Sequence, residues 1–218
     1  MKGFFAAAAV LAVTVCASAT QAATTYADRV SFEAALGTQV TDDYDSAYPA
    51  GFGVYDSAAM SAFLGETDYE STGFQDNNII QSTRTYCAGC NGSFRLSFTT
   101  TSVGTTLGVF GVGLDIDANS PFLPYDAFVT FGDGSTTTFD LNDGPRFFGL
   151  TSPLLVSEIH FTQASGDTTR SGSFVIDDLT IGAQADPPVI PVPASLPLMV
   201  TALAGAVALA RRRRDGSV

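Results

Sequence analysis

The sequence is poor in positive charge, histidine, cysteine and tryptophan. Its 218 residues include 22 Asp and Glu against 10 Lys and Arg, with one His, three Cys and no Trp. Half of the cations lie at the ends, as Lys2 and Arg211 to Arg214, so residues 24–183 carry 20 carboxylates against five Arg, a formal net charge of −15. Such a surface repels phosphate backbones, which excludes nucleic acid as the default partner.

The N-terminus has the pattern of a secretory signal peptide over residues 1–22. Lys2 precedes an apolar run from Phe4 to Val15, and small residues follow it as far as Ala22. We expect signal peptidase to cut after Ala19 or Ala22, because the apolar run is too short to stay as a membrane anchor. An uncleaved amphipathic start is the alternative.

The C-terminus combines a linker, an apolar segment and an arginine cluster. Residues 184–193 form a Pro-rich extended linker, and residues 194–210 are at the lower length limit for a transmembrane helix. The four arginines Arg211, Arg212, Arg213 and Arg214 would hold that end in the cytoplasm and orient the helix. The body between the two ends is therefore predicted to lie outside the cell.

Residues 190–214 resemble the PEP-CTERM sorting signal of Gram-negative envelopes. The resemblance is to the variant with a Val-Pro-Leu-Pro-Ala motif, which is matched here by Ile190, Pro191, Val192, Pro193 and Ala194. It implies that an exosortase, a transpeptidase-like membrane enzyme, recognises the tail and cuts near this motif. The protein would then be anchored transiently in the inner membrane before it reaches the cell surface or extracellular matrix. A simple tail anchor is the alternative.

The body, residues 24–183, is expected to be an all-β antiparallel β-sandwich, jelly-roll-like, with one or two short helices. The helices are expected over 28–37 and 56–65, because an Asp precedes and a Gly ends each apolar pattern. From Ser93 onward short apolar runs alternate with Gly, Asp, Asn and Pro, and Gly132-Asp133-Gly134 predicts a hairpin turn. The strands are expected over 94–98, 109–117, 127–131, 136–141, 147–150, 156–162 and 173–181.

The segment 126–181 resembles the bodies that commonly carry such sorting tails. The matching stretches are Phe131-Gly132-Asp133-Gly134, Phe147-Phe148-Gly149 and the run from Phe174 to Leu179. Those bodies are similar in architecture to carbohydrate-binding jelly rolls. The resemblance implies a fold and leaves the ligand open.

Cys87 and Cys90 are the two cysteines left after signal cleavage. In an oxidising compartment a pair at this spacing is expected to close into a small disulfide loop. The alternatives are a redox-active dithiol, which would need a helix start to lower the thiol pKa, and a zinc site, for which His160 is the one histidine available.

Four carboxylates form a candidate calcium site. Asp115 and Asp117 share one face of a strand end, because side chains two residues apart point the same way, and Asp177 and Asp178 end the last strand. Hard oxygen ligands brought together by folding select calcium. Solvated turn carboxylates are the alternative.

No catalytic residues can be assigned from the sequence, and the protein is expected not to be an enzyme. His160 lies in a strand with Glu158 on the same face, and no Gly-x-Ser-x-Gly turn presents a nucleophile. With 20 carboxylates, a glycosidase pair is neither excluded nor indicated.

Loop aromatics and threonine runs bear on the ligand. The aromatics could stack on sugars or cover the ends of the sandwich; they are Tyr44, Tyr48, Phe52, Tyr55, Tyr69 and Tyr125. The Thr triplets at 99–101 and 136–138 are better explained by β-propensity than by an ice-binding array. The expected function is a structural or adhesive role at the surface or in a biofilm matrix, with exopolysaccharide as the ligand. A surface polysaccharide hydrolase and, more remotely, an ice-binding protein are the alternatives.

Overall fold

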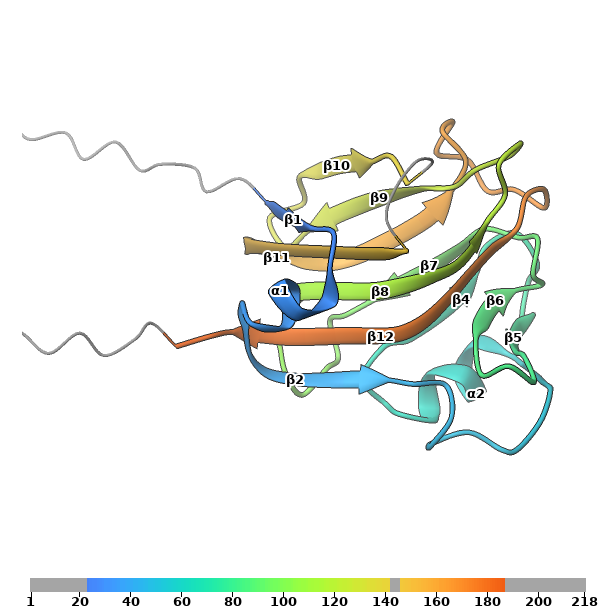
Figure 1. Ribbon diagram of the computed structural model, residues 1–218, viewed down its shortest axis with the longest axis horizontal. Coiled ribbons are helices and arrows are strands. Elements are labelled where there is room, and N and C mark those ends of the chain that lie inside the picture. Colours follow the sequence, from blue (N-terminus) through green and yellow to red (C-terminus); the bar gives the residue numbers. More distant parts are fainter. Residues whose placement is uncertain (1–22, 142–145, 187–218) are drawn as a thin grey trace, which may run out of the picture. The chain divides into compact units, whose positions relative to one another are not determined.

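The computed structural model describes residues 23–141 and 146–186 (Figure 1). The signal peptide, the motif Ile190 to Ala194, the apolar segment 194–210 and the cluster Arg211 to Arg214 lie outside the described residues. No helix within the described ranges is long and apolar enough to cross a membrane. The described residues up to Ala185 belong to one compact unit.

The described residues form a mostly antiparallel β structure with two short helices, as the sequence predicts at the level of an all-β class. The elements in chain order are β1 (Thr24–Tyr26), α1 (Arg29–Glu33), β2 (Leu36–Asp42), β3 (Gly53–Tyr55), α2 (Ser57–Ala62), β4 (Asp68–Ser71), β5 (Asn78–Ile80), β6 (Tyr86–Ala88), β7 (Phe94–Ser97), β8 (Val109–Asn119), β9 (Asp126–Phe131), β10 (Thr136–Phe139), β11 (Phe147–Thr162) and β12 (Phe174–Gln184).

The long strand β11 divides the curled sheet into two layers. Its first part, residues 147–151, pairs with β1 and β8, and β8 continues through β12 to β2. Its second part, residues 156–162, pairs with β9 and β7, which continue to β10 and β4. We call these the first and second layers. β6, β5 and β3 extend from β12 at one end of the sandwich (Figure 1).

The core lies between the two layers. Leu114 and Ile116 of β8 point into it from the first layer, and Leu96 and Ile159 point into it from the second. Because side chains alternate along a strand, their neighbours point outward and form the two outer faces of the sandwich. These outer faces carry the polar residues that could bind a ligand.

A second, smaller core attaches α1 to the outside of the first layer. Phe32 is fully buried there and packs with Leu36 and Phe147. The strands beneath it carry glycines: a Cβ atom added at Gly113 would lie 2.5 Å from Phe32 Cε1, and one at Gly149 would lie 3.0 Å from Phe32 Cδ2. These glycines in β8 and β11 leave the room that the Phe32 ring occupies.

The helix starts agree with the sequence prediction, and strands lie at each position where one was expected, whereas the strands before Ser93 were not predicted. Asp28 and Asp56 cap the two helices, accepting from the N–H groups of Ser31 and Ala59. The helix expected over 28–37 ends at Glu33, and β2 occupies Leu36–Asp42. The strands expected over 147–150 and 156–162 are one strand, and β12 extends to Gln184, which was assigned to the linker.

Candidate functional site

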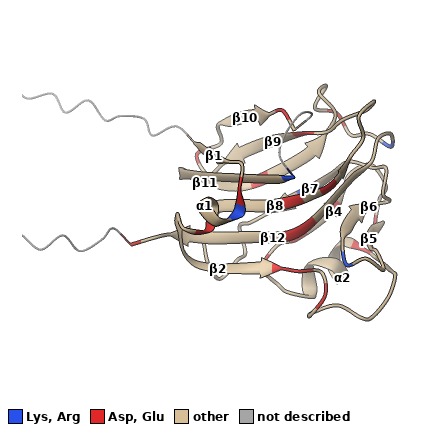
Figure 2. Ribbon diagram, viewed as in Figure 1, with Lys and Arg blue, Asp and Glu red and all other residues tan. Residues whose placement is uncertain are grey.

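The four aspartates of the predicted calcium site lie together on the outer face of the first layer. Asp115 of β8 is the register partner of Asp177 of β12, and Asp178 follows in a bulge with φ 45°. Asp117 is exposed on the same face of β8 as Asp115. Figure 2 shows this acidic cluster along the middle of β8 and β12.

Arg29 supplies a positive charge to this acidic cluster from α1. Its guanidinium donates to Asp115 Oδ2 and to the carbonyl oxygen of Asp178, both at 2.8 Å. It also donates to Thr180 Oγ1 at 2.8 Å and stands 5.0 Å above the centre of the Phe147 ring. Glu33 in the same helix also forms an ion pair with it at 3.4 Å. Arg29 is therefore held by five groups in all.

Asp177 is a partly buried carboxylate of the cluster with a raised pKa. Burial raises the pKa of Asp177 to about 6, and the neighbouring carboxylates of Asp178, Asp115 and Asp117 contribute to the rise. The N–H of Asp178 opposes it by donating to Asp177 Oδ1 at 2.8 Å. Part of the cluster can therefore take up a proton near pH 6.

The structure does not support a metal ion at this cluster. Within residues 23–141 and 146–186, no group of three or more His, Cys, Asp or Glu side chains is arranged to hold one. Calcium at Asp115, Asp117, Asp177 and Asp178 stays a prediction.

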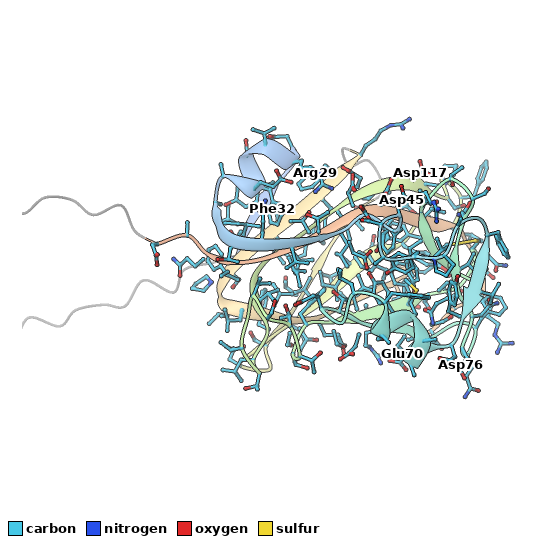
Figure 3. All side chains as sticks on the ribbon, turned by 90° about the horizontal axis from the view of Figure 1, so that it is seen from below. Arg29, Phe32, Asp45, Glu70, Asp76 and Asp117 are labelled. Carbon is cyan, nitrogen blue, oxygen red and sulfur yellow. A yellow bond between two sulfur atoms is a disulfide. The ribbon has the colours of Figure 1, made fainter. Side chains whose placement is uncertain are left out.

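The outer face of the second layer carries an array of mostly polar side chains, which we call the polar face. It spans five strands, from β4 through β7, β11 and β9 to β10. Its two adjacent rows are Glu70, Arg95, His160, Phe128 and Thr138, and Asp68, Ser97, Glu158, Thr130 and Thr136. Figure 3 shows Glu70 on the side of the molecule opposite to Arg29 and Asp117.

Arg95 organises the charges of the polar face. Its guanidinium pairs with Glu70 at 2.8 Å and with Glu158 at 3.0 Å, so one cation joins carboxylates from the strands on either side of β7. The contact with Glu70 is also a hydrogen bond, which fixes the orientation of the two planar groups. The half-buried ring of Phe128 lies beside them, and the loop at Gly166 approaches its edge.

His160 is a neutral, structural side chain within this face. It is only 8% exposed, and its Nε2 lies 3.0 Å from the Thr72 hydroxyl. Burial and the nearby charge of Arg95 lower the pKa of His160 to about 4, although Glu70 opposes them. Thr72 donates in turn to Ser93, which is fully buried. The only serine in this chain of contacts is thus closed to a substrate.

Most of the loop aromatics are buried, which agrees with the interpretation that they cover the end of the sandwich. Tyr44, Tyr48, Tyr69 and Tyr125 are buried, Tyr55 is half-buried, and Phe52 is 65% exposed. The hydroxyls of Tyr48 and Tyr69 donate to Asp42 Oδ2 at 2.7 and 2.8 Å. Burial raises the pKa of Asp42 despite these bonds and that from the Tyr44 N–H. Sugar stacking by these buried rings is therefore excluded.

Cys87 and Cys90 form a disulfide, as the sequence predicts. Cys87 is fully buried, and Phe74 packs against both Gly89 in the loop and Gly92 just after it. Arg170 stands 5.2 Å above the Phe74 ring and donates to the carbonyl oxygen of Gly73. The disulfide is thus part of a packed end of the sandwich.

Sequence reasoning missed Arg29 and Arg95, the two residues that organise the outer faces. Their partners come from strands far away in sequence, such as Asp115 for Arg29 and Glu158 for Arg95. Their rarity was the available signal, because five arginines among 20 carboxylates in residues 24–183 are each expected to be paired.

The chain matches no protein-family model, no curated protein and no solved structure.

Proposed function

We propose that this protein is an exported, non-catalytic component of the cell surface or extracellular matrix, and that its polar face binds polysaccharide. An exosortase-type enzyme would process the tail. The jelly-roll relationship belongs to the same proposal. Segment 126–181 resembles the bodies that commonly carry such sorting tails, and those bodies are similar in architecture to carbohydrate-binding jelly rolls.

The polar face carries this proposal. Its carboxylates, guanidinium and hydroxyls offer donors and acceptors in two rows that cross five strands, about 19 Å at the usual strand spacing. Sugar hydroxyls both donate and accept, and a half-exposed ring such as Phe128 adds an apolar surface on which a sugar can stack. An extended polymer suits rows that cross five strands better than a single small molecule, which would require a deep pocket.

The ion pairs on this face favour binding over hydrolysis. A glycosidase needs two carboxylates whose environments separate their roles as acid and base. Glu70 and Glu158 instead share one partner, Arg95, at 2.8 and 3.0 Å.

Retention on immobilised polysaccharides tests the proposal. We expect the fragment 23–186, which includes all the described residues of the compact unit that ends at Ala185, to be retained on at least one bacterial or plant polysaccharide. Phe128→Ala and Arg95→Ala should each weaken retention about tenfold, equivalent to the loss of one good contact. Asp117→Ala on the opposite face is the matched control and should bind like the wild type.

Three results would contradict this account. The first is a lack of retention on every polysaccharide, and the second is an equal loss in the Asp117→Ala control. The third is the release of new reducing ends by the wild type, which would establish the hydrolase alternative. Thermal hysteresis would favour ice binding, for which the structure offers little: Thr136 and Thr138 are exposed on β10, whereas residues 99–101 lie outside the strands.

A further inference from the structure

A buried carboxylate oxygen without a partner lies at the start of β9. Asp126 is 8% exposed, and its Oδ1 atom is enclosed without a hydrogen-bond partner among residues 23–141 and 146–186. Buried polar atoms in folded proteins are almost always satisfied by a hydrogen bond, a water molecule or an ion. This oxygen therefore needs a partner that the described residues do not supply.

A second carboxylate lies beside it, at the end of β10. Phe139 is the register partner of Ala127, so Asp140 follows next to Asp126 on the neighbouring strand. Burial raises the pKa of Asp126, and the charge of Asp140 raises it further. The N–H of Leu141 donates to the Asp126 carboxyl, which places that group against the end of β10. No Arg within the described ranges forms an ion pair with Asp126.

Backbone carbonyl groups complete an oxygen-rich corner. The side-chain amide of Asn119 donates to the carbonyl oxygens of Tyr125 and Leu141 at 3.2 and 3.3 Å, and its Oδ1 accepts from the Tyr125 N–H at 2.9 Å. One amide thus ties together the two segments that carry the carboxylates. Asp140 and Leu141 also line an open cavity of about 290 Å³, through which a hydrated ion could arrive.

We propose that a calcium ion binds between Asp126 and Asp140, with backbone carbonyl oxygens of this corner and water completing its coordination. Calcium accepts six to eight hard oxygen ligands in flexible geometry, so a site with two carboxylates and carbonyl groups suits it. The ion would satisfy Asp126 Oδ1 and remove the repulsion between the two carboxylates. This site differs from the acidic cluster of β8 and β12, where Arg29 already supplies the positive charge.

Thermal unfolding of the fragment 23–186 with calcium, with magnesium and with chelator tests the proposal. At a calcium concentration about 100 times Kd, we expect Tm to rise by roughly 5–10 °C relative to chelator. Asp126→Asn and Asp140→Asn should each abolish the shift, and magnesium should produce a smaller one. Asp140 is exposed, so its variant is expected to fold even if Asp126→Asn does not.

The control Asp177→Asn distinguishes this site from the acidic cluster of the first layer. The proposal requires this variant to keep the full calcium shift. It is overturned if calcium leaves Tm of the wild type unchanged, in which case Asp126 is a protonated acid. It is also overturned if the shift persists in Asp140→Asn, or if it disappears in Asp177→Asn.

Discussion

Arg29 illustrates at the scale of one residue how this acidic protein neutralises its own charge. Its guanidinium joins α1 to β8 and β12 through Asp115, the Asp178 carbonyl and Thr180. The sequence predicted that the aspartates would gather, because their positions in two strands could be read from the alternation. It could not show which cation faces them, since Arg29 lies 86 residues from Asp115.

Replacing Arg29 tests this role. We expect Arg29→Met to lower the free energy of unfolding by about 2 kcal/mol, because charged hydrogen bonds are lost and Asp115 is left without its partner. Arg29→Lys should recover only part of this, since an ammonium cannot reproduce the planar fork. Arg146→Met, at an exposed cation, is the control and should change little. Equal midpoints for Arg29→Met and the wild type in urea would contradict the assignment.

His160 predicts a pH dependence with a definite sign. Its pKa is about 4 in the folded protein and about 6.5 in the unfolded chain, so the unfolded chain binds the proton more readily. The stability associated with neutral His160 is fully present above pH 6.5 and is lost as the pH falls toward 4. Asp177 has the opposite effect on stability. Its pKa is raised to about 6, so the folded state binds a proton more readily than the unfolded chain in nearly the same pH range, and acidification through that range stabilises the fold.

Two variants separate the opposing effects of His160 and Asp177 on stability. Acidification from pH 7 to pH 4.5 should destabilise the wild type relative to His160→Gln, and denaturant unfolding at both pH values measures the difference. The same acidification should destabilise Asp177→Asn relative to the wild type. A constant difference between wild type and His160→Gln at the two pH values would show that His160 titrates normally.

At the scale of the elements, pattern length decided which strands could be predicted. β8, β9 and β12 combine at least six residues with clear alternation or apolar runs, and the Gly-Asp-Gly turn marks the β9–β10 hairpin. β3, β5 and β6 have three residues each, too few for a period to be detected. β2 pairs with β12, about 140 residues away, so its partner could not be inferred from local sequence.

The contact between α1 and the glycines beneath it gives a test at this scale. Gly113→Ala would put a methyl group 2.5 Å from Phe32 Cε1, and we expect a loss of about 1–3 kcal/mol in stability. Phe32→Ala should cost about 3 kcal/mol or more, because it empties a buried site. The double variant should cost clearly less than the sum, since the ring that clashes is gone. Additive losses in urea unfolding would show that the two residues do not meet.

At the scale of the whole molecule, the charge limits which polymers the body can approach. Residues 24–183 have a formal net charge of −15, and charges of one sign repel over about 8 Å at physiological salt. We expect stronger retention on neutral polysaccharides than on carboxylated analogues with the same backbone. The gap should narrow as salt rises, because screening weakens the repulsion. Preferential binding to the carboxylated polymer at low salt would contradict this expectation.

The central claim, that the body is delivered outside the cell by processing at both ends, can be tested by one measurement. The full chain is produced in a Gram-negative host with an exosortase, and the intact mass of the product is determined in each cell fraction. We predict a surface or extracellular species that begins at Thr20 or Ala23, ends near Ile190 to Ala194 and lacks the two thiol hydrogens of Cys87 and Cys90. Replacing Pro191 and Pro193 with Ala should leave the tail attached and the protein in the membrane. Release of that variant as efficiently as the wild type, or a wild type that keeps residues 195–218, would contradict the account.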